Sequence, residues 1–301
     1  MAEDTWTSAD YKRAGVLAGL TGVAMSALLA GIAWLTVPTQ IDGDLLYRLA
    51  PPQPDVRLEI TEADALAQAL DHAGLTWPPG PPPVPTVVNK QLPTDMAKLD
   101  PHARRALFLR LTWTPAMLVN RRIEQERQFV ARVTDGPLPR RGTVERHALD
   151  ILAARYDVAT SNDAFAETLL RRIDVVPAEL VMATAAIQSA WGISSMAVRA
   201  NALFGEWTDA RPGKPAAFGS LSDSIESFMH HINTAPELEA FREERERQRE
   251  SGAFPELSLL AARLAPVSPR GTDFARDIDG LIQQHTLHLA GTPSADQGER
   301  H

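Results

Sequence analysis

The chain has 301 residues, of which 44% are hydrophobic and 23% charged, so most of it is expected to fold as one domain of ordinary size with appendages. Its formal net charge of −8 argues against a nucleic-acid partner, because nucleic-acid-binding proteins usually carry a basic face. The absence of cysteine excludes disulfides, thiolate metal sites and thiol catalysis, but it fits any cellular compartment.

An apolar segment without any charged residue spans residues 14–37. About 20 apolar residues are needed to cross a bilayer, whereas a cleaved signal peptide has an apolar core of only about 7–15 residues. The length therefore favours a transmembrane anchor. A cleaved signal stays open as the alternative, because small residues such as Gly31 and Ala33 could form a cleavage site.

The charges on either side of this segment predict its orientation. Lys12 and Arg13 precede it, and Asp42 and Asp44 follow it. Because positive flanking charge stays in the cytoplasm, residues 1–13 are predicted as a cytoplasmic tail. The protein is then a single-pass inner-membrane protein whose C-terminal part lies in the periplasm.

Residues 38–85 are predicted as a proline-rich periplasmic linker with one short helix. The helix is expected over residues 61–75, where Thr61 can cap its start and Gly74 can end it. The following WPPGPPPVP, residues 77–85, is typical of a stiff spacer. A site for a proline-binding partner is the alternative interpretation of that run.

The rest of the chain is predicted to be mainly α, with at most a small β-hairpin, because alternating strand patterns are nearly absent. Residues 86–160 are expected as a helical segment, interrupted at Pro115, that precedes a second helical region at 161–290. Within the latter, the charged run 241–250 indicates a solvated helix. The polar tail 291–301 is expected to be disordered.

One predicted helix is apolar on nearly all sides, as a buried central helix is: PAELVMATAAIQSAW, which Pro177 opens. Gln188 lies near its C-terminal end, just before Trp191 and Gly192. A carboxylic acid there would have a raised pKa, because the helix dipole and an apolar setting both disfavour its charged form. Such a carboxyl can act as a general acid on a glycosidic oxygen. The amide of Gln188 can form hydrogen bonds, but it has no acidic proton to donate.

The stretch VVPAELVMATAAIQSAWGISSMAVRANALFGEWT, residues 175–208, resembles the pattern of the bacterial Bax-like glucosaminidases of glycoside hydrolase family 73. Two later stretches, residues 218–247 and 264–282, resemble the next family motifs in the family's order. The resemblance covers about residues 85–288. It implies a lysozyme-like helical domain that acts on peptidoglycan glycan strands, without a metal or cofactor. The matching positions in the first stretch are Pro177, Leu180, Ala185, Ala186, Ser189, Trp191, Gly192, Ser194, Ala197, Asn201, Leu203, Phe204, Gly205 and Trp207.

The departures from this pattern bear on catalysis. The position of the family's catalytic Glu holds Gln188, and tyrosines of the later motifs are replaced by Phe228, Leu238, Val267 and Phe274. Several correlated losses indicate natural decay of catalysis with retention of the fold, rather than one inactivating change.

The resemblance also implies a substrate-binding set, which lies around Gln188 and consists of Trp191, Ser194, Asn201, Phe204, Gly205, Trp207 and Phe274. Each has an ordinary structural alternative: the aromatic residues could be core, and the polar residues could satisfy loop backbone. Glu206 is a possible replacement acid or simply an exposed residue, and the further candidate acids are Asp209, Asp223 and Glu226. His230 and His231 are expected on the surface, since neighbours on a helix do not face one another as metal ligands would.

Three functional hypotheses follow. The first is a membrane-anchored periplasmic protein that is catalytically impaired and binds glycan strands or a cell-wall protein. The second is an active endo-β-N-acetylglucosaminidase, either with a relocated acid such as Glu206 or with Glu at position 188 in the native gene. The third is a family relic that serves only as an interaction scaffold.

Overall fold

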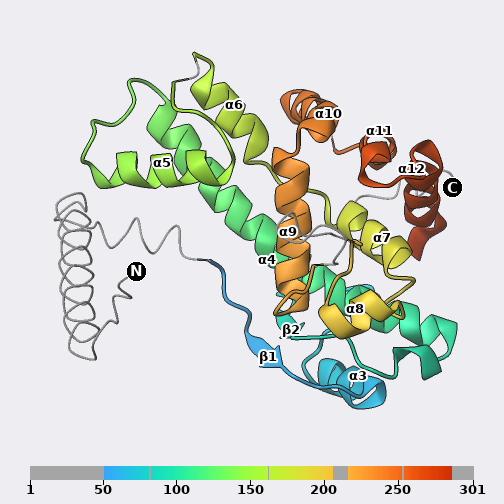
Figure 1. Cartoon of the computed structure of the whole chain (residues 1–301). Coiled ribbons are helices and arrows are strands. Elements are labelled where there is room, and N and C mark those ends of the chain that lie inside the picture. The colour runs from blue at the N-terminus through green and yellow to red at the C-terminus, as the bar shows by residue number, and fades with distance from the viewer. Residues whose placement is uncertain (1–50, 81–82, 162, 206–215, 253, 287–301) are drawn as a thin grey trace, which may run out of the picture.

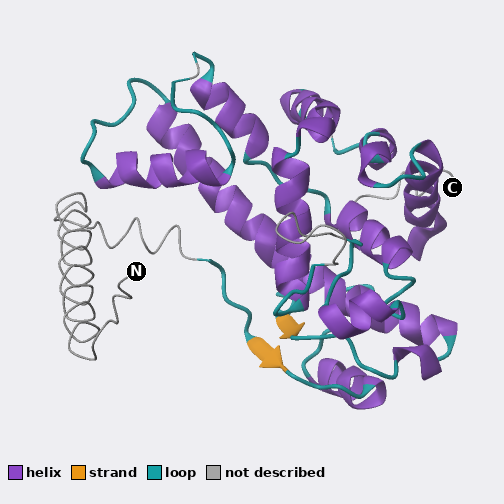
Figure 2. Ribbon diagram, viewed as in Figure 1, coloured by secondary structure: helices purple, strands orange, loops and turns teal. Residues whose placement is uncertain are grey.

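A computed structural model describes residues 51–80, 83–161, 163–205, 216–252 and 254–286. The described chain is mainly helical, as the sequence predicted, and Figure 2 shows two short strands beside the helices. The predicted anchor at 14–37 and the tail at 291–301 lie outside the described residues. Within the described ranges, no helix combines the length and the apolar character needed to cross a membrane.

The elements follow one another along the chain as Figure 1 labels them. They are β1 (Val56–Leu58), α3 (Ala63–His72), β2 (Val87–Asn89), α4 (Pro101–Thr134), α5 (Val144–Arg155), α6 (Phe165–Arg172), α7 (Ala178–Gln188), α8 (Ser195–Ala200), α9 (Leu221–Thr234), α10 (Glu239–Glu250), α11 (Leu257–Ala262) and α12 (Thr272–Leu281). Short 3₁₀ turns lie at Met96–Lys98, Pro236–Leu238 and Ala265–Val267, and a π turn at Ile282–Thr286 follows α12.

The region predicted as a linker is partly folded onto the rest of the protein. Strands β1 and β2 pair in parallel, with Val56 opposite Val87, so they form a crossover around α3 and not the hairpin that the sequence allowed. The predicted helix α3 is confirmed, and its Leu66 and Leu70 are fully buried. The helix within the predicted linker therefore contributes to the core.

The two ends of α3 show one wrong and one correct prediction. The helix is not capped by Thr61, because the backbone N–H of Ala63 donates to Asp95 Oδ1 at 2.9 Å. Gly74 does end the helical segment, with a left-handed φ of 76° that glycine adopts without steric cost.

The prediction that Pro115 interrupts its helix is wrong: α4 continues unbroken through that residue. Proline removes one backbone hydrogen bond and costs about 3 kcal/mol in a helix interior. Burial on both sides of Pro115 offsets this cost, since Leu111, Ala116 and Val119 are all buried. Figure 1 shows α4 as the long helix that crosses the molecule, and it packs against α7 and α9.

One continuous hydrophobic core joins the two segments, 86–160 and 161–290, that were predicted separately from the sequence. It includes Leu66 of α3, Phe108 of α4, Leu180 of α7, Phe228 of α9 and Ile278 of α12. Helix α7 lies inside this core, and it is buried from Leu180 to Ala186 as its all-round apolar sequence predicted. The site at the C-terminal end of α7 is therefore supported by helices from both predicted segments.

The predicted helix at 241–250 is confirmed, but only one of its faces is solvated. In α10 the residues Arg242 and Arg245 are only 0% and 5% exposed, and Glu244 is also buried. A guanidinium tolerates such burial when carboxylate and carbonyl oxygens satisfy its fixed fork of donors. Arg242 donates to the backbone carbonyls of Ile232 and Ala235 at 2.9 and 2.8 Å. Because backbone carbonyls are not visible in a charge pattern, the sequence does not reveal that this face of the helix is buried.

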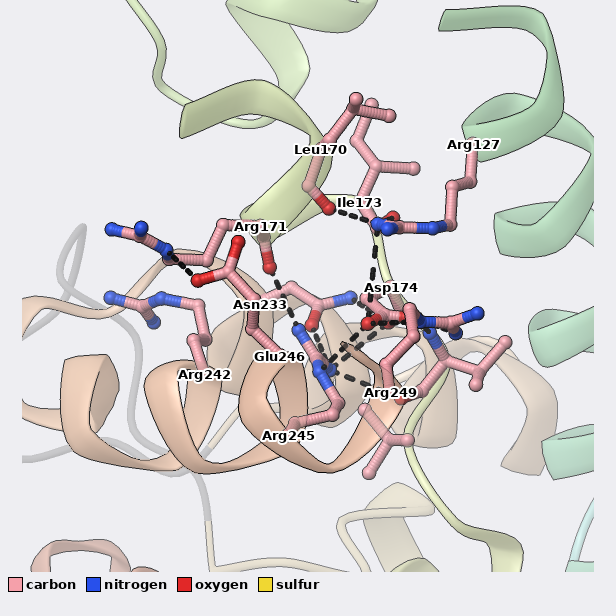
Figure 3. A network of polar contacts seen from close by, with 12 residues as sticks. Arg127, Leu170, Arg171, Ile173, Asp174, Asn233, Arg242, Arg245, Glu246 and Arg249 are labelled. Carbon is pink, nitrogen blue, oxygen red and sulfur yellow. Dashed lines mark hydrogen bonds and ion pairs between the residues drawn. The ribbon is translucent and has the colours of Figure 1, made fainter. Parts of the chain in front are cut away.

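Asp174 is the centre of the buried polar network that Figure 3 shows. Its side chain is 2% exposed, and it accepts hydrogen bonds from both Nε and Nη2 of Arg249. Arg245 Nε lies 3.5 Å from Asp174 Oδ2, and Arg127 Nη1 lies 4.0 Å from the same oxygen. Burial lowers the pKa of Arg245 to about 10, and the Asp174 carboxylate opposes that shift.

The network fixes the segment that leads into α7. The backbone carbonyl of Asp174 accepts from Asn233 Nδ2 at 3.0 Å and from Arg245 Nη1 at 3.1 Å. Asn233 belongs to α9, Arg245 to α10, and Arg127 to α4. Three helices are thereby joined to the chain just before α7, which ends at Gln188.

Candidate functional site

The turn after α7 determines where Gln188 and Trp191 lie. Gln188 is the last residue of the helix, and Ala190, Trp191 and Gly192 follow with φ values of 52°, 60° and 80°. Left-handed φ is uncommon for residues other than glycine and persists only where the surroundings hold it. Here the N–H of Trp191 donates to the carbonyl of Ala186 at 2.8 Å, which closes the turn.

Two neighbours fix this turn further. The buried Ser189 accepts the N–H of Gly192 on its Oγ at 2.9 Å. A Cβ at Gly192 would lie 3.0 Å from a ring carbon of Phe108 and 3.2 Å from Leu92. Glycine is therefore required at 192 both by its φ and by the close approach of the core.

The segment after α8 brings a second glycine against Gln188. Gly205 has φ of 62°, and a Cβ there would lie 3.2 Å from Gln188 Oε1. The preceding Phe204 stacks on Phe228 of α9, with ring centroids 4.0 Å apart and planes 6° from parallel. Phe204 is thus a core residue that fixes the Gly205 backbone beside the Gln188 amide.

The two predicted polar residues mainly support the backbone. Ser194 caps α8, because its Oγ accepts the N–H of Ala197 at 3.2 Å. Asn201 ends α8 with φ of 52°, and its Nδ2 donates to the carbonyl of Phe218 at 3.2 Å. Its buried Oδ1 has no hydrogen-bond partner among the described residues. These hydrogen bonds support the alternative interpretation of both residues, in which Ser194 and Asn201 satisfy loop backbone.

Trp191 is half-buried and is held by α4 from two sides. Phe108 meets it edge to face, at 5.9 Å between centroids and 72° between planes. The guanidinium carbon of Arg105 lies 5.2 Å from the Trp191 ring centroid. Arg105 and Phe108 could not be predicted as neighbours of Trp191, since both lie far from the motif in the chain and nothing in their spacing marks them.

Gln188 itself is half-buried at the negative end of α7. No described residue forms a hydrogen bond with its side-chain amide. The group can donate to and accept from a ligand without changing charge. It cannot supply a proton at this position.

The remaining predicted site residues lie elsewhere or outside the described residues. Phe274 is 1% exposed in the core, so it presents almost no surface to a ligand. Glu206, Trp207 and Asp209 fall in the undescribed stretch 206–215.

The last two candidate acids, Asp223 and Glu226, line a separate cavity of about 180 Å³ between α4, α9 and the chain around β1. Gln188 is not among the residues that line it. Arg122 Nη1 forms an ion pair with Glu226 Oε1 at 2.7 Å. A replacement acid at Asp223 or Glu226 stays a prediction.

The two histidines of α9 have separate surroundings. His230 is half-buried, and burial lowers its pKa, whereas His231 is exposed and lies 3.7 Å from Glu237. In the part of the chain that the structure describes, no group of three or more metal-binding side chains converges.

The structure is a mainly helical domain in which the amide of Gln188 lies at the end of the buried helix α7. The turn that carries Trp191 and the backbone of Gly205 lie beside it. No protein-family model matches the chain, and no solved structure matches it. Protein bax of Escherichia coli (strain K12) is 29% identical to it over 158 residues. That likeness covers 48% of this chain and 57% of Protein bax, so the chain spans little more than half of that relative's length.

The contact between Gly205 and Gln188 can be tested with a matched pair of substitutions. Gly205→Ala and Gly252→Ala both place a side chain at a similar left-handed φ, 62° and 65°, but nothing lies within 4 Å of a Cβ at Gly252. We expect each to cost about 1–2 kcal/mol of unfolding free energy, measured by denaturant titration. Only Gly205→Ala should also weaken the glycan binding that the family resemblance implies, because only its methyl displaces the Gln188 amide. Equal effects of both variants on binding would contradict the contact's role.

Proposed function

We propose that this protein binds peptidoglycan glycan strands at the Gln188 site and has lost efficient glycan cleavage. The observation that carries the proposal is the position of Gln188: at the negative end of a buried helix, against Gly205 and three residues from Trp191. This is the place where a glucosaminidase of the resembled type would hold its protonated acid.

The neutral amide supports retained binding. An unpaired carboxylate at a half-buried position has a desolvation cost, which the amide avoids. The amide can also donate to and accept from sugar hydroxyl and acetamido groups. Trp191, with its strained backbone turn held by Ser189 and Phe108, supplies a fixed aromatic side chain next to it.

The similarity to Protein bax supports the same proposal, because it agrees with the family suggested by the ordered motifs. Assignment to glycoside hydrolase family 73 and action on peptidoglycan belong to this proposal. We also propose that Ser194, Asn201, Phe204 and Gly205 belong to the site, where they support its backbone.

Calorimetric titration with chitooligosaccharides and with peptide-free glycan strands tests the binding. We expect dissociation constants in the micromolar to millimolar range, which corresponds to about 4–8 kcal/mol. Trp191→Ala should weaken binding, whereas Phe254→Ala, which removes an exposed aromatic ring on the α10–α11 connection, should not. No heat and no chemical shift change at millimolar sugar would favour the interaction-scaffold hypothesis instead.

We also propose that residues 14–37 anchor the protein in the inner membrane, with the folded domain in the periplasm. The lack of charge across this segment and the charges on its two sides support the proposal. A reporter fused after residue 60 should be active only in the periplasm, and the protein should stay with membranes after a carbonate wash. Soluble periplasmic protein with a new N-terminus near Trp34 would instead indicate a cleaved signal.

A further inference from the structure

We propose that Arg105 recognises a carboxylate on the sugar bound at Trp191, so that the site prefers glycan strands with free acidic substituents over neutral ones. This rests on the proposed function and specifies its ligand. In peptidoglycan stripped of its peptides, alternate sugars carry a lactyl group whose carboxylate is free. In strands that keep their peptides, the same carboxylate is consumed in an amide bond.

The charge of Arg105 is not compensated within the described part of the protein. Its guanidinium carbon lies 5.2 Å from the Trp191 ring centroid, and no described carboxylate forms an ion pair with it. Two other arginines of α4 are paired, Arg110 with Asp71 at 2.6 Å and Arg122 with Glu226 at 2.7 Å. Arg105 therefore brings an exposed positive charge to the edge of the candidate site.

The positions of Arg105 and Trp191 relative to each other are fixed by α4 and by the turn after α7. Arg105 and Phe108 are three residues apart on α4, so they lie on the same face of the helix. Both contact Trp191, Phe108 by its ring edge and Arg105 by its cation. The backbone turn that carries Trp191 is closed by its own N–H to the Ala186 carbonyl at 2.8 Å. The relative position of cation and ring is thus a property of the fold.

The chemistry of the pair matches an acidic sugar. The aromatic ring offers an apolar surface for the sugar, and a guanidinium that contacts a ring still has N–H donors for a carboxylate. Arginine binds carboxylates through two parallel hydrogen bonds, which a neutral hydroxyl cannot reproduce. Because Gln188 is neutral, it does not repel an anionic ligand as a carboxylate at that position would.

The test compares two soluble tetrasaccharides of equal length by calorimetry at low ionic strength. One is neutral chitotetraose, and the other alternates N-acetylglucosamine with N-acetylmuramic acid and carries free lactyl carboxylates. We expect the wild-type protein to bind the acidic sugar about three- to tenfold more tightly, as suits a partly exposed ion pair, and the preference to fade as salt is added. An amidated form of the acidic sugar should bind like the neutral one.

Matched variants separate a local contact from the overall charge of the protein. Arg105→Gln should abolish the preference, and Arg105→Lys should retain part of it. Arg121→Gln removes the same charge from another exposed position of α4 and should leave the preference intact. Three results would overturn the inference but not the proposed function. They are equal affinity of the unsubstituted protein for both sugars, survival of the preference in Arg105→Gln, and an equal loss of affinity for both sugars in that variant. Failure of every saccharide to bind would overturn the proposed function and, with it, this inference.

Discussion

Replacement of Gln188 by Glu is expected to raise the rate of glycan cleavage at least about 100-fold over that of the chain with Gln188. Loss of a positioned general acid typically costs about 10²–10⁴ in rate, and glutamate has nearly the shape of glutamine, so it fits beside Gly205. The helix end and partial burial should raise the pKa of the new carboxyl and keep it protonated. The measurement is the release of reducing ends from isolated peptidoglycan.

Gln188→Ala is the control for this experiment, because it changes the same position without supplying an acid. It should be as inactive as the chain with Gln188. Robust cleavage by the chain with Gln188, at a rate close to that of Gln188→Glu, would contradict the proposed loss of catalysis. Loss of that activity on Glu206→Gln would then identify Glu206 as a relocated acid.

Removal of the Asp174 carboxylate is expected to be the most destabilising single change in the network of Figure 3. Asp174→Ala leaves the buried Arg245 without its nearest counter-ion and removes both acceptors of Arg249. Breaking a buried ion pair by deleting one partner costs about 3–5 kcal/mol, because an uncompensated charge stays buried. Denaturant unfolding followed by circular dichroism measures the loss.

An exposed ion pair provides the comparison. Arg146 and Asp150 on α5 are 2.9 Å apart, and the Asp150 side chain is 46% exposed. Asp150→Ala should cost only about 0.3–0.5 kcal/mol, as exposed helical pairs do. If Asp174→Ala is as mild as Asp150→Ala, the network does not hold α7 in the way described.

Apolar periodicity was sufficient to predict the main helices, and it failed where tertiary contacts override local sequence. Pro115 reads as a helix break, but the buried residues around it keep α4 continuous. The run at 241–250 looks solvated, because nothing in the charge pattern reveals that Asp174 and backbone carbonyls lie against Arg242 and Arg245. The parallel strands β1 and β2 are three residues each, too short for an alternating pattern to appear.

The candidate site was predictable in its centre and not in its surroundings. Gln188 and Gly205 belong to one continuous motif, and the structure places them so close that a Cβ at Gly205 would lie 3.2 Å from Gln188 Oε1. Phe274 was assigned to the substrate-binding set only because it stands at the position of a motif tyrosine. It has no hydroxyl and is 1% exposed in the core, so its motif position did not predict its surroundings. Arg105 comes from α4, and only the packing of α4 against the turn after α7 reveals it.

The most direct test of the central claim measures binding and cleavage in one sample. The detergent-solubilised protein is mixed with insoluble isolated peptidoglycan sacculi and centrifuged, and the pellet and supernatant are assayed for protein and soluble glycan fragments. We expect the protein to pellet with the sacculi, Trp191→Ala to pellet less, and the supernatant to stay free of glycan fragments. Protein left in the supernatant, or glycan fragments released into the supernatant by the chain with Gln188, would contradict the proposed binding without cleavage.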